Sequence, residues 1–410
     1  MKQAKILFFV VITLFTLVLV SCVPGRAQSA RGWSGTAVHD GILYTGSVDG
    51  RVVAINSSTG NLEWSYTIAP VAAPSSGLSC GQSSVSTTIY GTPIVDGDIV
   101  YVGSYSGKVV ALNKLARSQD LPFPQKRYGE WEWDCPKTGT SGGISCGQIQ
   151  ENNAIVAGLV LYGDAIYLSS SNGRVYSLDK EFGDLKRKDP PDLGEKLWTS
   201  PVIQGDTIYV STFEGHIYTL STKTGDRLPW SFESEVGFAS HSVIYEDTIY
   251  VGSFDNKLYA IKIGDSEPSW SFSGGKWFWS APLVNEGVVY AGCLDGKVYA
   301  IGAETGEELW QFESRDPRGK PVPIVSSPVL MDKLLIVADE LGSVYVFDLN
   351  AEPEDKAVVP LKIISIGAAV RGSLCAQEGL VYIRGQDNWV YVLDIDRGGL
   401  SWKSPLTIEE

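Results

Sequence analysis

The sequence has few histidines and a shortage of positive charge. Its 410 residues include three histidines, His39, His216 and His241, which leaves little material for a polyhistidine metal centre or a Ser-His-Asp triad. Lysine and arginine number 33 against 47 aspartates and glutamates, for a formal net charge of −14. A chain this acidic does not attract nucleic acid or anionic lipid head groups through long-range charge. We therefore expect no metal centre and no nucleic-acid partner.

A run long enough to span a membrane is also missing at the N-terminus. The uncharged apolar segment from Ile6 to Val20 has fifteen residues, fewer than the roughly 20 that a spanning helix needs. Lys2 and Lys5 precede it, and Ser21-Cys22 follows. This order of a positive region, an apolar region and small residues predicts a secretory signal peptide.

The end of this segment, Leu19-Val20-Ser21-Cys22, resembles a bacterial lipobox, in which the cysteine thiol receives diacylglycerol. We expect residues 1–22 to be a lipoprotein signal peptide, Cys22 to be the lipidation site, and residues 23–32 to be a tether. The alternative is an ordinary signal peptide cleaved near Ala27 or Ala30. Both interpretations export the chain. The first anchors it to a bacterial membrane, either the outer membrane or the extracytoplasmic face of the cytoplasmic membrane.

The sequence is rich in glycine and contains a repeated motif. The chain has 44 glycines and 11% aromatic residues, too many turn residues for a helical bundle. A Val/Ile-Tyr pair, a short turn, Gly or Asn and an aliphatic strand recur eight times, with the Gly or Asn at Gly50, Gly107, Gly173, Gly215, Asn256, Gly296, Gly342 and Asn388. Repeats of 40 to 66 residues made of short strands predict an all-β fold, an eight-bladed β-propeller over residues 33–410.

Each repeat predicts a four-stranded antiparallel blade, with strands A to D. In the sixth repeat we expect strands over residues 281–285, 288–292, 297–301 and 308–312. Asp295-Gly296 joins B to C and predicts a type I′ turn. Strand D carries a tryptophan in seven of the eight copies, namely Trp64, Trp133, Trp198, Trp230, Trp270, Trp310 and Trp402.

The phrase Ala-x-Asn-x-x-Thr-Gly-x-x-x-Trp, from Ala54 to Trp64 and in modified form from Ala300 to Trp310, resembles the repeat of quinoprotein-type (PQQ-like) propellers. The resemblance implies that the seven tryptophans dock between neighbouring blades and are structural. An exported, lipidated chain of this size is similar to the BamB-like propeller lipoproteins of the outer-membrane β-barrel assembly machinery. That similarity implies a monomeric, non-enzymatic, membrane-tethered scaffold that binds a protein partner of the cell envelope, in envelope or outer-membrane protein assembly.

The same repeat occurs in quinone-dependent oxidoreductases, which are the main alternative. Those enzymes are longer, place a vicinal cysteine pair against the quinone, and bind Ca²⁺ through Asn, Glu and a catalytic Asp. The six cysteines of this chain include no adjacent pair, and no acidic cluster has the required spacing. We expect no catalytic residue and no cofactor. A propeller that binds a small ligand or senses a surface is a further alternative.

Insertions interrupt the repeat at residues 69–90 and 134–157, and both contain the phrase Gly-x-Ser-Cys-Gly-Gln. An exported chain lies in a compartment that permits disulfides. We predict a bridge between Cys80 and Cys146, and a bridge between Cys135 and Cys146 is the next alternative. A third insertion, residues 180–195, falls between strands C and D of the third repeat and is interpreted as a solvated loop.

An acidic residue precedes the B-to-C glycine or asparagine in five of the eight repeats. Radial symmetry places these acids on one face, where they would attract a basic peptide. The favoured interpretation is that the turn itself requires them. They are Asp49, Glu214, Asp255, Asp295 and Asp387.

Three consecutive aromatic residues, Trp277-Phe278-Trp279, precede strand A of the sixth repeat. Because side chains alternate along a strand, at least one ring should project toward the loop face that bears the first two insertions. Aromatic and arginine side chains dominate binding hot spots, so we assign a partner-binding set to this face. It consists of Trp277, Phe278, Tyr90, Phe238 and Arg371. The alternative is that the rings plug the mouth of the channel.

Overall fold

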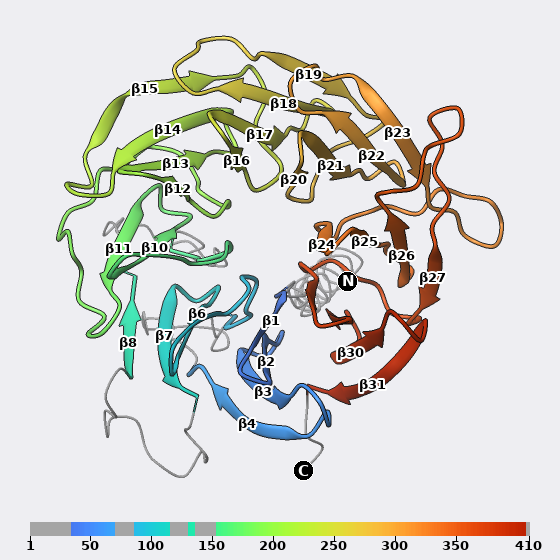
Figure 1. The fold of residues 1–410 in the computed structure, drawn as a ribbon. Coiled ribbons are helices and arrows are strands. Elements are labelled where there is room, and N and C mark those ends of the chain that lie inside the picture. The colour runs from blue at the N-terminus through green and yellow to red at the C-terminus, as the bar shows by residue number, and fades with distance from the viewer. Residues whose placement is uncertain (1–33, 70–85, 115–129, 136–152, 407–410) are drawn as a thin grey trace, which may run out of the picture. The chain divides into compact units, whose positions relative to one another are not determined.

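The computed structural model describes residues 34–69, 86–114, 130–135 and 153–406. These residues form eight antiparallel sheets that follow one another around a ring (Figure 1). Strand order within each sheet follows the chain, so every blade is a simple meander. The described residues contain no helix, and so none that would cross a membrane. The predicted fold class, an all-β eight-bladed propeller, is confirmed.

The first four blades contain fifteen strands. Blade 1 is β1 (Thr36–His39), β2 (Ile42–Gly46), β3 (Arg51–Asn56) and β4 (Leu62–Thr67). Blade 2 is β5 (Ile94–Asp96), β6 (Ile99–Gly103), β7 (Lys108–Asn113) and β8 (Trp131–Asp134). Blade 3 is β9 (Val160–Tyr162), β10 (Ala165–Ser169) and β11 (Val175–Asp179). Blade 4 is β12 (Val202–Gln204), β13 (Thr207–Ser211), β14 (His216–Ser221) and β15 (Arg227–Glu233).

The last four blades have four strands each. Blade 5 is β16 (Val243–Tyr245), β17 (Thr248–Gly252), β18 (Lys257–Lys262) and β19 (Trp270–Ser273). Blade 6 is β20 (Leu283–Asn285), β21 (Val288–Gly292), β22 (Lys297–Gly302) and β23 (Glu308–Glu313). Blade 7 is β24 (Val329–Met331), β25 (Leu334–Ala338), β26 (Ser343–Asp348) and β27 (Lys362–Ser365). Blade 8 is β28 (Cys375–Gln377), β29 (Leu380–Arg384), β30 (Trp389–Asp394) and β31 (Gly399–Pro405).

The second and third strands of each blade form the core. In β3, the four residues from Val52 to Ile55 are fully buried although their side chains alternate between the two faces. Both faces are covered because a neighbouring blade packs on each side. This is why these strands read as continuous apolar runs in the sequence rather than as an alternating pattern.

The predicted type I′ turn between strands B and C is wrong. That turn type needs positive φ at both central residues, but of the pair Asp295-Gly296 only Gly296 has it, with φ 92°. The Gly296 amide instead donates to the Cys293 carbonyl, 3.1 Å away, which closes a four-residue turn. Paired positive φ values occur between strands A and B, for example at Glu286-Gly287.

The outer strand of most blades carries an indole that donates a hydrogen bond to the next blade. The indole N–H of Trp64, Trp230, Trp270 and Trp402 reaches backbone carbonyls of the following C-to-D loop at 2.8 to 3.1 Å. In blade 2 this position belongs to Trp131, which is buried, pairs with Ala111 and donates to the Lys180 carbonyl at 2.9 Å. Trp133, which the sequence predicted as the docking residue, lies two residues further along β8, pairs with Val109 and contacts Tyr176.

Blade 7 replaces the indole with an amine. Lys362 pairs with Val346 at the register position of the tryptophans, and its Nζ donates to the carbonyls of Ile395 and Asp396 in blade 8. The ring closes at the joint between blades 8 and 1. There the Trp402 indole donates to the Ser57 carbonyl at 3.0 Å, and Thr36 Oγ1 donates to the Tyr382 carbonyl at 3.0 Å.

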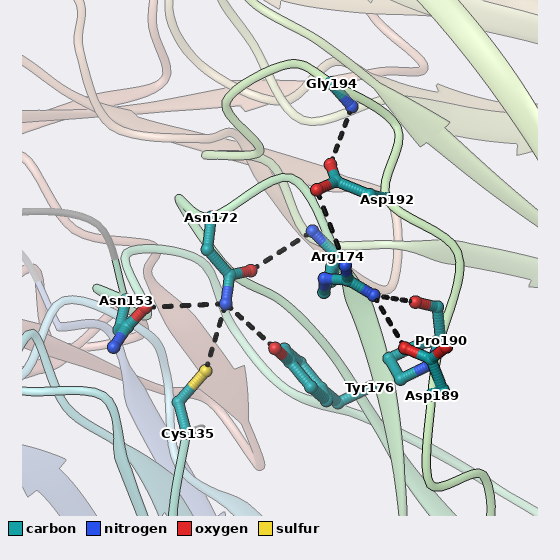
Figure 2. A network of polar contacts seen from close by, with 9 residues as sticks. All are labelled: Cys135, Asn153, Asn172, Arg174, Tyr176, Asp189, Pro190, Asp192 and Gly194. Carbon is teal, nitrogen blue, oxygen red and sulfur yellow. Dashed lines mark hydrogen bonds and ion pairs between the residues drawn. The ribbon is translucent and has the colours of Figure 1, made fainter. Parts of the chain in front are cut away.

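Blade 3 has three strands among the described residues, and the insertion at residues 180–195 takes the place of the fourth. Arg174 fixes this segment by ion pairs to Asp189 at 3.2 Å and Asp192 at 3.5 Å (Figure 2). The predicted strand around Trp198 is therefore absent. Trp198 lies in the loop before β12, where its ring contacts Phe213.

Candidate functional site

A buried apolar residue lies five positions before strand A in seven blades. All seven side chains are at most 1% exposed, which makes this a second ring of inter-blade contacts beside the docking tryptophans. The residues are Ile89, Ile155, Leu197, Phe238, Phe278, Ile324 and Val370. Phe238 and Phe278, which the sequence suggested as partner-binding residues, belong to this ring. They are core residues because the chain turns inward here to enter strand A.

The rings beside these positions form a continuous series across blades 4 to 6, which we call the aromatic arc. Its members are Trp198, Phe213, Phe254, Trp277 and Trp279. Ring centroids are 4.8 Å apart for Trp198 and Phe213 and 5.1 Å apart for Phe213 and Phe254. Phe254 then contacts Trp277 edge-on at 5.0 Å and Trp279 at 6.3 Å.

The arc lies on the face made by the D-to-A loops and the B-to-C turns. Phe213 and Phe254 occupy equivalent B-to-C turns, and the three tryptophans come from D-to-A loops. Trp277 is 41% exposed, and the other four members are partly exposed. Adjacent half-exposed rings offer apolar surface with little loss of conformational freedom on binding, which suits the recognition of a polypeptide.

The backbone beneath the arc is tightly fitted. A Cβ atom at Gly237 would lie 1.7 Å from the Phe213 carbonyl oxygen, so only glycine permits this approach of the D-to-A loop to the turn. The same loop carries His241, whose Nδ1 accepts a hydrogen bond at 2.9 Å from the amide of Ser200 in the preceding D-to-A loop. His241 lies deep among the inner loops with only part of its ring accessible, and desolvation lowers its pKa to about 4.

Two other predicted partner-binding residues lie on the same face but outside the arc. Tyr90 is partly exposed and contacts Tyr105 at a centroid distance of 5.6 Å. Arg371 forms an ion pair with Glu340, with 2.7 Å between Nε and Oε1. Tyr90, Trp198, Trp279 and Arg371 all stand four positions before strand A, next to the buried ring. The face therefore has an aromatic sector, which is the arc of blades 4 to 6, and a charged sector, which is the ion pair of Glu340 and Arg371.

Four of the five acids before the B-to-C glycine or asparagine accept hydrogen bonds within their own turns, whereas the fifth, Glu214, is exposed. Asp295 accepts the Lys297 amide on Oδ1 at 2.9 Å and the Tyr299 hydroxyl on Oδ2 at 2.7 Å. Burial, reinforced by this carboxylate, raises the pKa of the Tyr299 hydroxyl. Asp255 and Asp387 bind tyrosines four residues further on in the same way. In blade 3, Asn172 substitutes for the acid and donates to Tyr176 at 2.8 Å (Figure 2). These contacts support the structural interpretation of the acids.

Several predicted sites lie outside the described residues. The lipidation site Cys22 and the predicted bridge between Cys80 and Cys146 stay predictions. Cys135 is described and buried, and its Sγ donates to Ser170 Oγ at 3.6 Å. Within the described part of the chain no three His, Cys, Asp or Glu side chains gather closely enough to hold a metal ion.

Comparison with known proteins identifies relatives. A family model described as outer membrane protein assembly factor BamB matches residues 23–189 and 226–407. The outer membrane protein assembly factor BamB of Bordetella pertussis is 27% identical over 100 residues, and the match spans 24% of this chain and 24% of that curated relative.

Two solved structures share the fold. The crystal structure of BamB from Moraxella catarrhalis has 18% identity and a TM-score of 0.59, covering 87% of this chain and 92% of that one. The computationally designed Ika8 protein has 15% identity and a TM-score of 0.63, covering 90% of this chain and 98% of that one. Identities this low indicate the fold alone. The family model, however, matches most of the chain, and the protein therefore belongs to the BamB family of PQQ-like β-propellers.

Proposed function

We propose that the protein is a non-enzymatic, membrane-tethered scaffold of the cell envelope that binds a protein partner through the aromatic arc and acts in outer-membrane protein assembly. The observation that carries the proposal is the arc itself. Five aromatic side chains from three blades and four loop or turn segments form one partly exposed apolar surface. The contacts that close the propeller between blades 8 and 1 do not involve them. Membership of a family described as outer membrane protein assembly factors supplies the cellular context.

The test uses a host strain that lacks the gene and is complemented in turn with each variant. In the arc variant, Phe213→Ala, Phe254→Ala and Trp277→Ala are combined. The control combines Tyr162→Ala and Phe182→Ala, two exposed aromatics outside the loop face, with 42% and 65% exposure. The readout is the amount of folded β-barrel protein in the outer membrane, measured by its heat-modifiable electrophoretic mobility.

We expect the arc variant to leave folded β-barrel protein near the level of the deletion strain, and the control to restore it. Full restoration by a stably expressed arc variant would contradict the proposal. The tether is tested separately, because Cys22→Ala should move the protein from the membrane fraction to the soluble envelope fraction. Intact-mass analysis that finds an unmodified N-terminus downstream of residue 22 would contradict the lipid anchor.

The quinone-dependent alternative makes a different prediction. A bound quinone would give purified protein a near-ultraviolet or visible absorption band and would support dye reduction with an alcohol or sugar. The proposed scaffold shows neither property.

A further inference from the structure

The outer edge of blade 7 exposes more apolar surface than the other outer strands. Val359, Leu361 and Ile363 are 84%, 58% and 61% exposed. From residue 357 to residue 365 the exposed positions alternate with covered ones, so these three side chains share one side of an extended segment that ends in β27. Figure 1 shows β27 at the perimeter of the ring.

Other outer strands expose polar side chains, or a single leucine, at the corresponding places. In β15 the exposed residues are arginine, proline, serine and glutamate, and in β19 they are serines. In β4, β23 and β31 one large apolar residue is exposed in each, respectively Leu62, Leu309 and Leu400. Charges, prolines and short polar strands keep sheet edges from pairing with other chains. In blade 7, Pro360 and Lys362 alternate with the three apolar residues but lie on the more covered side of the segment, and the exposed side carries neither a proline nor a charge from Val359 to Ile363.

The neighbouring blade shows what such an edge accepts. The C-to-D loop of blade 7 lies along the outer edge of β23, where the Gln311 amide donates to the Lys356 carbonyl at 2.9 Å and Gln311 forms a parallel bridge with Ala357. An extended segment thus adds to the perimeter of blade 6. β27 itself pairs on its inner side with β26, from Ser343–Ser365 to Val346–Lys362. Among the described residues no strand pairs with its outer side.

Charge around this edge favours a basic occupant. Glu352, Glu354 and Asp355 are exposed in the loop that leads to β27, and Lys356 is the one exposed basic residue of that loop, so the loop carries a net negative charge. The nearby Lys362 is engaged, because its Nζ donates to two carbonyls of blade 8. An acidic border repels a second copy of this acidic chain and an anionic lipid surface, and it attracts lysine and arginine.

We propose that β27 is an acceptor edge to which an extended segment of another polypeptide adds as a fifth strand of blade 7. The segment carries alternating apolar and basic residues. Its apolar side chains cover Val359, Leu361 and Ile363, its backbone pairs with the outer side of β27, and its basic side chains face the acidic border. This surface is on the perimeter of the ring, apart from the aromatic arc, and its occupancy does not depend on the function proposed for the arc.

A synthetic probe tests this inference on the full mature chain. The probe is a fluorescein-labelled peptide of alternating valine and lysine, and binding is followed by fluorescence anisotropy. We expect Leu361→Ser with Ile363→Ser to weaken binding by about tenfold or more, since two apolar contacts are lost. The matched control, Leu62→Ser with Leu400→Ser, removes one exposed leucine from each of two other outer strands and should leave affinity within about twofold.

Two further probes separate the components of the surface. A peptide with glutamate in place of lysine should bind at least about tenfold more weakly, and so should a lysine peptide that is N-methylated on the edge-facing amides. The arc variant should bind the lysine peptide as the wild type does. Equal affinity for the β27 variant and its control, or for the lysine and glutamate peptides, overturns the proposal. It is also overturned if sedimentation shows a dimer of the chain that the β27 substitutions dissolve.

Discussion

The B-to-C turns of blades 5 and 7 have the same backbone and opposite chemistry. In blade 5 the Phe254 amide donates to the Gly237 carbonyl at 3.0 Å, and in blade 7 the Glu340 amide donates to the Pro323 carbonyl at 3.0 Å. The side chains differ, because Phe254 joins the aromatic arc whereas Glu340 pairs with Arg371. In both turns the hydrogen bond that fixes the turn is made by backbone atoms. The fold therefore does not dictate which side chain occupies position 254 or 340. The aromatic sector is thus not required by the propeller.

The joints between blades show a similar contrast of aromatic and charged side chains. Blades 1, 5 and 8 dock through tryptophans, whereas blade 7 docks through Lys362. In blade 8 the buried Arg384 ends β29, and burial lowers the pKa of its guanidinium to about 10. On the loop face itself, blades 4 to 6 offer the rings of the aromatic arc, whereas Glu340 and Arg371 offer charges that are already engaged with each other.

The largest expected effect on the free energy of unfolding comes from Trp131, an aromatic residue with a structural role, and it provides a reference for substitutions in the arc. Trp131→Ala removes a buried indole and its hydrogen bond to Lys180, so we expect a loss of about 3–5 kcal/mol in the free energy of unfolding. Trp133→Ala removes a partly exposed ring and should cost about 2 kcal/mol less. Denaturant unfolding measures both. Equal losses would contradict the assignment of Trp131 as the docking residue.

That assignment shows where sequence reasoning reached its limit. The segment Trp131-Glu132-Trp133 offers two indoles on the same face of one strand, and the pattern alone does not fix which of them pairs with Ala111. The core strands were predictable because continuous apolar runs permit few alternatives. The missing fourth strand of blade 3 was not, because its place is taken by a segment that Arg174 holds through side-chain ion pairs.

The arc was predicted only in part. Alternation suggested correctly that one ring of Trp277-Phe278-Trp279 projects, and the structure exposes Trp277 while burying Phe278. The set of buried residues five positions before strand A was predictable from the sequence, because an apolar residue recurs at that position in seven blades. Phe213 and Phe254 were missed because turn positions tolerate most residues, so a single sequence does not reveal why phenylalanine stands there.

An acid-sensitive contact beneath the arc gives the next prediction. Because folding lowers the pKa of His241 to about 4, its contribution to stability is complete above the unfolded value of about 6.5 and is lost as pH falls toward 4. With part of the ring accessible, we expect a loss of about 1–3 kcal/mol over this range. His241→Asn keeps an acceptor for the Ser200 amide and should flatten that part of the pH profile. A pH profile of the unfolding free energy that His241→Asn leaves unchanged would contradict this assignment.

The joint between blades 7 and 8 gives a smaller effect. Lys362→Met removes the amine that donates to Ile395 and Asp396, so we expect a loss of about 1 kcal/mol in unfolding free energy. Lys362→Arg should restore part of it. If thermal unfolding shows no difference between Lys362→Met and the wild type, the lysine does not replace the docking tryptophan.

The smallest effect on stability is expected within the arc, where exchange of the two chemistries tests the comparison directly. Phe213→Gln with Phe254→Gln gives blades 4 and 5 the polar side chain that blade 8 has at Gln386. Each substitution loses ring contacts on a partly exposed surface and should cost about 1 kcal/mol or less. The reciprocal change, Gln386→Phe, adds a ring outside the arc and serves as the control.

The most direct test of the claim that the arc binds a partner combines site-specific photo-crosslinking in intact cells with thermal unfolding. A photoreactive phenylalanine analogue at position 254 should give a defined crosslinked product, and the same analogue at position 182 should not. Phe213→Gln with Trp277→Ala should abolish the product while moving the thermal midpoint by only about 2–4 °C. Crosslinking that survives these substitutions, or a large fall in the midpoint without loss of the product, would contradict the account.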